Sequence, residues 1–196
     1  MKVRSQITKR SAALLCGMAL ALGAGSATAV AADRAAAQPA ESTYAAQAEA
    51  VGLSARQAAQ VQDRVDAQLA AMKVPAEQVG YNEIRAKDGS ATITMAVPGV
   101  TDTSCDDEYL CLWRDANWTG TKLSFSVCAF RDLNDYAFNN DTLTSYKNSQ
   151  TRGTVARFYN WQGGSWVQKF TSTAPHTEDS LANTPWNDMI DGVRVC

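Results

Sequence analysis

Two short segments constrain the fold of this chain more than any other part of its sequence. The first, residues 111–120, reads C-L-W-R-D-A-N-W-T-G and places aromatic residues at Trp113 and Trp118 and a glycine at Gly120. Aromatic side chains at this spacing can stack across a tightly folded turn, and glycine supplies a backbone conformation that a side chain would block. The second, residues 140–145, reads N-D-T-L-T-S and is rich in side-chain oxygens. Together they indicate a small β-module that recognises or holds other molecules, not a catalyst.

The N-terminus has the features of a secretory signal peptide, expected over residues 1–32. Basic residues come first, an apolar run follows at residues 11–25, and small residues at 27–29 suit a cleavage site. The apolar run is too short to cross a bilayer. We therefore expect the protein to be secreted and extracellular.

Four of the five cysteines lie after the expected leader. Outside the cell an even number of thiols normally forms disulfides, and four cysteines allow three pairings among which the sequence does not choose. We expect one bridge, Cys105–Cys111, because it closes a short local loop. We expect the other, Cys128–Cys196, because it ties the last residue back to the module, and closing so long a loop is worth about 4 kcal/mol in the chain-entropy model.

Aromatic residues divide the chain, because all but two of them, Tyr44 and Tyr81, lie between positions 105 and 196. Aromatic side chains bury the most surface each, so the main core is expected in residues 105–196. A domain of this size is small enough to gain from disulfides. Residues 33–50 are rich in alanine and poor in large apolar residues, which predicts a flexible linker.

Residues 51–98 are expected to form a helix followed by a β-hairpin. Ser54 and Gln57 form a capping-box pattern, after which apolar residues recur every three or four positions. Residues 79–86 and 91–97 have the character of two strands joined by an Asp-Gly turn. This unit either packs on the C-terminal domain or is removed as a pro-region.

The C-terminal domain shows the short alternating segments of antiparallel strands. Leu123, Phe125 and Val127, for example, alternate toward one side. Glycine and asparagine cluster between such segments, and turn signals at this spacing indicate a sandwich of antiparallel strands. The candidate strands are residues 109–114, 121–127, 155–159, 165–170 and 189–195.

The oxygen-rich run at residues 140–145 predicts either a calcium site or a structural clamp. Asn140, Asp141 and Thr144 offer oxygens to a hard cation such as Ca²⁺, which takes six to eight of them, so a second loop must contribute. In the structural alternative, asparagine and aspartate cap their own turns and Ser145 pins the hairpin backbone by hydrogen bonds.

A second, degraded copy of both features follows in the C-terminal half. Residues 187–192 keep the leading Asn-Asp pair but end in Asp-Gly, so Asp188 and Asp191 become further candidate calcium ligands. The matching hairpin, residues 159–166, has aromatics but no glycine two positions after Trp166. The sequence therefore predicts two related halves, with no cofactor required and calcium as the one cation that they suit.

These motifs resemble those of peptidase inhibitor family I36. The resemblance rests on C-x5-C-L-W beginning at Cys105, N-W-x-G ending at Gly120 and F-N-N-D-x-x-T-S beginning at Phe138. It is dense over residues 105–148, looser toward the C-terminus and absent from the N-terminal third apart from the secretory context. The family comprises secreted actinobacterial proteins with a βγ-crystallin-like fold, and its founding type inhibits metalloproteinases.

The resemblance implies a mainly β fold, with a βγ-crystallin-like Greek-key sandwich over residues 105–196 preceded by the helix-plus-hairpin segment. It implies a non-catalytic inhibitor of an extracellular protease, with a metalloprotease as the expected partner and a monomer as the expected state. No motif locates the inhibitory loop. The alternative is a calcium-binding, βγ-crystallin-like structural or recognition module without inhibitory activity.

Composition argues against several other functions. The chain has 18 basic and 20 acidic residues with no basic stripe, so neither nucleic acid nor a membrane is an expected partner. Its one histidine, His176, is expected in a polar loop without a nucleophile motif, which argues against hydrolytic triads and zinc sites built from several histidines. Trp161, Trp166 and Trp186 either pack in the core or offer faces for protein or sugar recognition.

Overall fold

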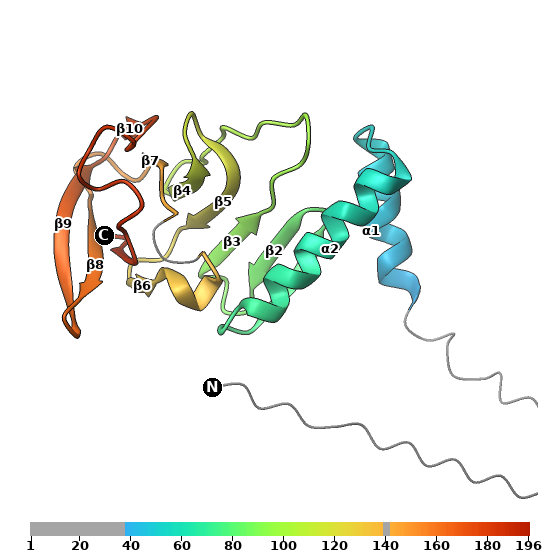
Figure 1. Ribbon diagram of the computed structural model, residues 1–196, viewed down its shortest axis with the longest axis horizontal. Helices are drawn as coiled ribbons and strands as arrows, with labels where there is room; N and C mark the ends of the chain where they lie inside the picture. Colours follow the sequence, from blue (N-terminus) through green and yellow to red (C-terminus); the bar gives the residue numbers. More distant parts are fainter. Residues whose placement is uncertain (1–37, 139–141) are drawn as a thin grey trace, which may run out of the picture. The chain divides into compact units, whose positions relative to one another are not determined.

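The computed structural model describes residues 38–138 and 142–196 (Figure 1). The expected leader and the clamp residues Asn140 and Asp141 lie outside the described residues. Two helices precede the strands, and one short 3₁₀ helix lies among them. The elements in chain order are α1 (Gln38–Ala50), α2 (Ala55–Ala71), β1 (Ala76–Gly80), β2 (Glu83–Ala86), β3 (Ala91–Thr94), β4 (Leu110–Asp115), β5 (Thr119–Phe125), β6 (Phe130–Asp132), η1 (Leu133–Tyr136), β7 (Ser145–Asn148), β8 (Val155–Gln162), β9 (Ser165–Thr173), β10 (His176–Glu178) and β11 (Gly192–Arg194).

The helix α2 begins with the capping box that the sequence predicts. The Ser54 hydroxyl accepts the Gln57 backbone N–H at 3.4 Å, and the Gln57 side chain accepts the Ser54 backbone N–H at 3.0 Å. Val61 and Val65 are fully buried on one face of the helix. At its C-terminal end the Gln68 amide donates to the backbone carbonyl of Tyr136 at 2.7 Å, which joins α2 to η1.

Helix α1 corrects the expectation of a flexible linker, because most of residues 33–50 are helical. Alanine has the highest helix propensity, and small side chains let neighbouring elements approach closely. Ala48 is buried, and the Tyr44 hydroxyl donates to the backbone carbonyl of Gln78 at 2.7 Å. Tertiary contacts therefore fix a segment whose lack of large apolar residues suggested a linker.

The larger sheet is antiparallel and contains strands from both the helix-plus-hairpin segment and the domain that follows. Its order is β1-β2-β3-β5-β4-β7-β10. Strand β3 pairs directly with β5, placing Ile93 opposite Leu123 with both side chains buried. The single strand expected at residues 79–86 is two strands, because the chain turns at Tyr81–Asn82 and the Asn82 amide is held by the backbone carbonyl of Met95 at 3.0 Å.

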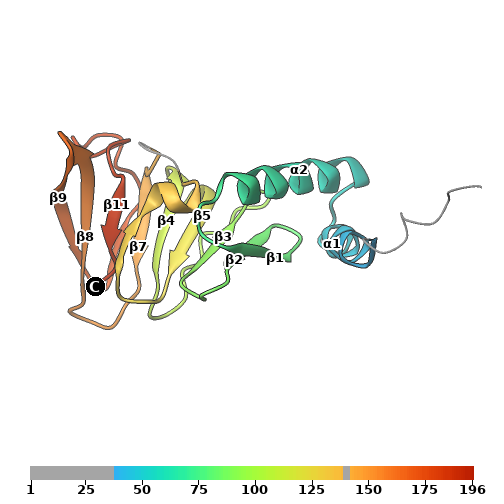
Figure 2. The same ribbon diagram turned by 90° about the horizontal axis from the view of Figure 1, so that it is seen from below.

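The smaller sheet has the order β6-β11-β8-β9 and faces the larger one (Figure 2). The chain passes repeatedly between the sheets, so β6 and β11, far apart in sequence, pair side by side. Aromatic rings fill the space between them: Phe158 stacks on Phe170 with centroids 4.3 Å apart, and Tyr146 lies 5.0 Å from Phe158. The predicted mainly β fold, preceded by a helix and a hairpin, is confirmed, and α1 is an additional helix that was not predicted.

Three local expectations need correction. Val127 is 46% exposed, because β5 ends at Phe125 before the expected alternation is complete. His176 lies in β10, opposite Asn148 of β7, and not in a loop. Strands β6, β7 and β10 were not expected, since each is only three or four residues long. Within the described chain no helix is both long enough and apolar enough to cross a membrane.

Candidate functional site

The β4–β5 hairpin is folded tightly back on itself at its tip. Asn117 and Trp118 adopt positive φ values of 58° and 55°, and Gly120 has a φ of 77°. A Cβ on Gly120 would overlap the Asp115 side chain, lying 2.9 Å from its Cγ. Trp113 and Gly120 therefore belong to one bent ribbon in which glycine is required both by its φ and by the approach of Asp115.

Ser145 fastens this folded tip to the sheet. Its hydroxyl donates to the backbone carbonyl of Asp115 at 2.6 Å and accepts the backbone N–H of Trp118 at 3.1 Å, and its side chain is fully buried. Thr144 adds a backbone N–H bond to the carbonyl of Trp113 at 3.1 Å. The described part of the clamp thus has the structural role that the sequence left open as an alternative.

Lys147 replaces the expected stacking of Trp113 on Trp118. Its ammonium lies 4.2 Å from the ring centroid of Trp118 and 5.9 Å from that of Trp113, within cation–π range of both. In the described chain no ring contact joins the two tryptophans. The same ammonium donates to the backbone carbonyl of Thr103 at 2.6 Å, so the hairpin is tied to the loop that precedes β4.

That loop, residues 101–108, is called the braced loop because side chains of the larger sheet bind three of its carbonyls in succession. The Trp113 indole donates to the carbonyl of Asp102 at 2.9 Å, Lys147 holds the next carbonyl, and Lys122 donates to the carbonyl of Ser104 at 3.2 Å. The disulfide Cys105–Cys111 follows, with Cα atoms 5.9 Å apart. The braced loop is part of the connection from β3 to β4, which runs along one edge of the larger sheet (Figure 1).

An ion pair between Lys122 and Asp102 stabilises the braced loop. Lys122, whose side chain is only 11% exposed, contacts the Asp102 carboxylate, which also accepts the backbone N–H of Ser104 at 3.0 Å. Burial opposes the charged form of Asp102, but the hydrogen bonds from Lys122 and Ser104 outweigh it, so the pKa of this carboxyl is lowered from 3.8. The charged state of Asp102 is therefore part of the folded loop.

The braced loop combines an exposed surface with a fixed backbone. Thr103, Ser104, Asp106 and Asp107 are exposed, while the carbonyls of residues 102–104 accept hydrogen bonds from side chains of the sheet. Such a segment loses little conformational entropy when a partner binds. The sequence analysis did not single it out; the short Cys105–Cys111 bridge beside a Thr/Ser/Asp run was the available signal.

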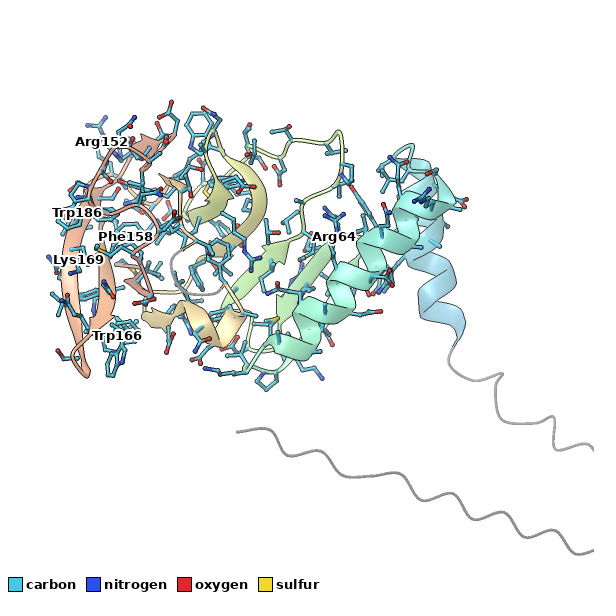
Figure 3. All side chains as sticks on the ribbon, viewed as in Figure 1. Arg64, Arg152, Phe158, Trp166, Lys169 and Trp186 are labelled. Atoms are coloured by element: carbon cyan, nitrogen blue, oxygen red, sulfur yellow. A yellow bond between two sulfur atoms is a disulfide. The ribbon has the colours of Figure 1, made fainter. Side chains whose placement is uncertain are left out.

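The second half fastens its hairpin with different chemistry. The Asp191 carboxylate accepts the backbone N–H of Trp161 through Oδ2 at 2.7 Å, and the Asp191 N–H donates to the carbonyl of Tyr159 at 2.9 Å. Where the first half has Ser145, the second has Gly192. A Cβ at Gly192 would lie 2.8 Å from Cζ3 of Trp166, which lies at the end of the β8–β9 hairpin (Figure 3).

Three of the five residues predicted as calcium ligands, Thr144, Asp188 and Asp191, lie among the described residues. Asn140 and Asp141 lie outside the described residues. Thr144 is engaged through its backbone, Asp188 is exposed and accepts the Asn187 side-chain amide at 2.6 Å, and Asp191 is buried. Across residues 38–138 and 142–196 no group of three His, Cys, Asp or Glu side chains could hold a metal ion.

The second disulfide joins Cys128 to the C-terminal Cys196, with Cα atoms 5.1 Å apart across 68 positions. Beside it, the Gln150 amide donates to the carbonyl of Val195 at 2.6 Å. Both bridges are the ones expected from the sequence. They hold the braced loop at one point and the chain terminus at another, as is consistent with an extracellular protein.

The chain is similar to several solved structures. Solved structures similar to the chain include a βγ-crystallin domain from Clostridium beijerinckii (22% identity, 43% of this chain and 93% of that one, TM-score 0.35) and one from Flavobacterium johnsoniae (23%, 43% and 90%, 0.34). A structure titled for the evolution of the eye lens βγ-crystallin domain fold is also similar (16%, 54% and 95%, 0.37). No curated protein matches the chain.

The family comparison covers the braced loop, the first hairpin and its clamp, and the strands as far as β10. The matching family model is described as peptidase inhibitor family I36, and it spans residues 101–178. The resemblance seen in the sequence is therefore confirmed over this region: residues 101–178 match the model of peptidase inhibitor family I36.

Proposed function

We propose that this protein is a secreted, non-catalytic inhibitor that blocks an extracellular protease, with metalloproteases as the expected targets, and that it presents the braced loop to the protease. The observation that carries this proposal is the support of residues 102–105, where three consecutive carbonyls and a disulfide fix an exposed segment. The family match begins at position 101 and so includes the whole loop.

A fixed loop suits inhibition for a physical reason. A flexible segment entering a protease cleft loses conformational entropy and, once cut, separates into two mobile ends. A segment held by Trp113, Lys122 and Lys147 is already ordered, and its bridge to Cys111 keeps one end in place. The exposed side chains of Thr103 and Ser104 are the first candidates for contact with the enzyme.

The test is titration of thermolysin-like and serine proteases with the mature protein and two variants. Thr103→Trp places a bulky group on the exposed face of the loop, where it should block docking and raise the inhibition constant at least about tenfold. Thr171→Trp, on exposed β9, is the matched control and should inhibit like the unaltered protein. Unchanged protease rates at micromolar protein, or equal inhibition by both variants, would contradict the proposal.

A calcium-binding module without inhibitory activity is the alternative prediction. The observation in its favour is Asp191, which is 7% exposed and whose Oδ1 accepts no hydrogen bond from the described residues. Calcium that binds only the folded protein would then stabilise it by RT ln(1 + [Ca²⁺]/Kd), where Kd is the dissociation constant of the site. Thermal unfolding with calcium and with chelator separates this alternative from inhibition.

A further inference from the structure

The β8–β9 hairpin and η1 enclose a cleft of about 270 Å³ that the inhibitor proposal does not use. Its walls are two indoles and three polar side chains: Trp161, Trp166, Asp132, Asn134 and Asp191. The braced loop and the first hairpin, on which the inhibitor proposal rests, contribute no residue to this lining. The cleft therefore needs its own explanation.

The indoles form an aromatic wall with a free face. Trp161 is 52% exposed, although exposing so large an apolar side chain is unfavourable. Trp166 meets it edge to face, with centroids 5.0 Å apart and planes at 63°. Trp166 is itself held by Phe130, 4.8 Å away, and by the bare Cα of Gly192. The wall is thus positioned by packing and does not simply project into solvent.

The polar lining is acidic and incompletely bonded. Asp191 is more than nine-tenths buried. Its Oδ2 accepts a hydrogen bond from the backbone N–H of Trp161 at 2.7 Å, whereas its Oδ1 has no hydrogen-bond partner among the described residues. Asp132 is the second carboxylate, and it accepts the Asn134 N–H through Oδ1 at 3.0 Å. No lysine or arginine lines the cleft, and no ion pair of the described chain includes either carboxylate.

These features select a cationic, hydrogen-bond-donating ligand with a flat apolar face. A buried carboxylate is costly unless it is paired, which a neutral sugar cannot do and a cation can. Ca²⁺ takes six to eight oxygens, more than the side chains of Asp132, Asn134 and Asp191 supply. A guanidinium stacks on indole and donates several hydrogen bonds to carboxylates at once, and it does so better than an ammonium.

We propose that this cleft binds an arginine side chain of a protein partner, with Trp161 stacking on the guanidinium and the carboxylates of Asp132 and Asp191 accepting its hydrogen bonds. The inference stands apart from the inhibitor proposal, because the braced loop precedes β4 and the cleft is lined by residues of the β8–β9 hairpin, of η1 and of the segments beside η1 and β11. Either can fail without the other.

The experiment titrates the ¹⁵N-labelled mature protein with N-acetylarginine amide and follows the indole N–H signals by NMR. N-acetylcitrulline amide, which has nearly the same shape without the charge, is the ligand control. The expected result is saturable movement of the Trp161 and Trp166 signals with arginine and little with citrulline. Because the probe is small, the result does not depend on any protease.

Two variants test the aromatic wall and the acidic lining separately. Asp191 is left unchanged because it holds the backbone of the β8–β9 hairpin. Trp161→Ala removes the exposed indole, and Asp132→Asn removes one charge while keeping a side chain that caps η1 equally well. Each should weaken arginine binding about tenfold, the change expected from one partly desolvated contact. Asp63→Asn, an exposed change on α2, should bind as the unaltered protein does.

Several outcomes would overturn the proposal. Equal binding of citrulline and arginine, tighter binding of N-acetylglucosamine or of Ca²⁺ at the same signals, or no saturable change would each do so. So would unchanged affinity in both folded variants, with the fold of each checked by the dispersion of its amide signals.

Discussion

Removal of one hydroxyl, in Ser145→Ala, should cost the folded state about 2 kcal/mol. The hydroxyl bonds two backbone groups of the folded hairpin, the carbonyl of Asp115 at 2.6 Å and the N–H of Trp118 at 3.1 Å. A backbone group left without its partner costs about 1–3 kcal/mol when buried, and partial exposure of the hairpin tip lets water recover some of that loss. The lower end of the range therefore applies to each of the two groups.

Backbone conformation adds to this cost, because Asn117 and Trp118 both hold positive φ values, which are unfavourable for residues with a Cβ. Ser145 is one of the contacts that keep them there. The compact unit that contains Ser145 spans residues 37–196, and for a unit of that size a loss of about 2 kcal/mol lowers the melting temperature by about 4–8 °C.

The assay is thermal and urea unfolding of the oxidised protein, followed by tryptophan fluorescence and circular dichroism, with and without calcium. Ser126→Ala, at an exposed position, is the matched control and should change the free energy of unfolding by less than about 0.5 kcal/mol. If Ser145→Ala costs no more than that control in chelator, the hydroxyl does not fasten the hairpin and the structural interpretation of the clamp is wrong.

Three other predictions follow from the first half of the domain. Gly120→Ala should lower the free energy of unfolding by about 1–3 kcal/mol in urea titrations, because φ is 77° and the new Cβ meets the Asp115 side chain; an unchanged midpoint would count against this. The pKa of Asp102 is lowered in the folded protein, so its charge stabilises the fold above pH 3.8, and this contribution is lost as the pH falls through the folded-state pKa. Asp102→Asn should therefore be less stable than the unaltered protein at neutral pH, and urea titrations at lower pH should show this difference in the free energy of unfolding becoming smaller. If calcium binds at the clamp, millimolar Ca²⁺ raises the melting temperature and Asp141→Ala abolishes the rise, whereas equal curves in calcium and chelator remove the site.

Periodic and pairwise signals in the sequence were sufficient for the main architecture. The capping box at Ser54, the bent ribbon from Trp113 to Gly120 and the structural alternative for Ser145 all appear in the structure. The capping box and the bent ribbon depend on residues close in sequence, where spacing alone determines which groups can meet. Ser145 meets Asp115 and Trp118 across 30 and 27 positions, and its role was predicted from the motif that it ends.

The features that the sequence missed depend on contacts between distant segments. Helix α1 exists because Tyr44 and Ala48 meet other elements, and no local pattern announces those contacts. The braced loop needs Lys122 and Lys147, which come from strands β5 and β7 and meet it only after the sheet has formed. Short strands such as β6 are defined by their partners and carry too few residues to show alternation.

The two hairpins show how a small sequence change alters what a clamp can do. A serine hydroxyl both donates and accepts, so Ser145 satisfies two backbone groups and retains little capacity for a ligand. A carboxylate only accepts, so when Asp191 holds the N–H of Trp161 it leaves a charged oxygen without a partner. In the first half the ammonium of Lys147 lies within cation–π range of Trp113 and Trp118. In the second half the carboxylates of Asp132 and Asp191 line a cleft beside the exposed indole of Trp161. The Ser145 fastening thus leaves no acceptor atom of its own unused, whereas the Asp191 fastening leaves one carboxylate oxygen without a partner among the described residues, and the arginine proposal rests on this difference.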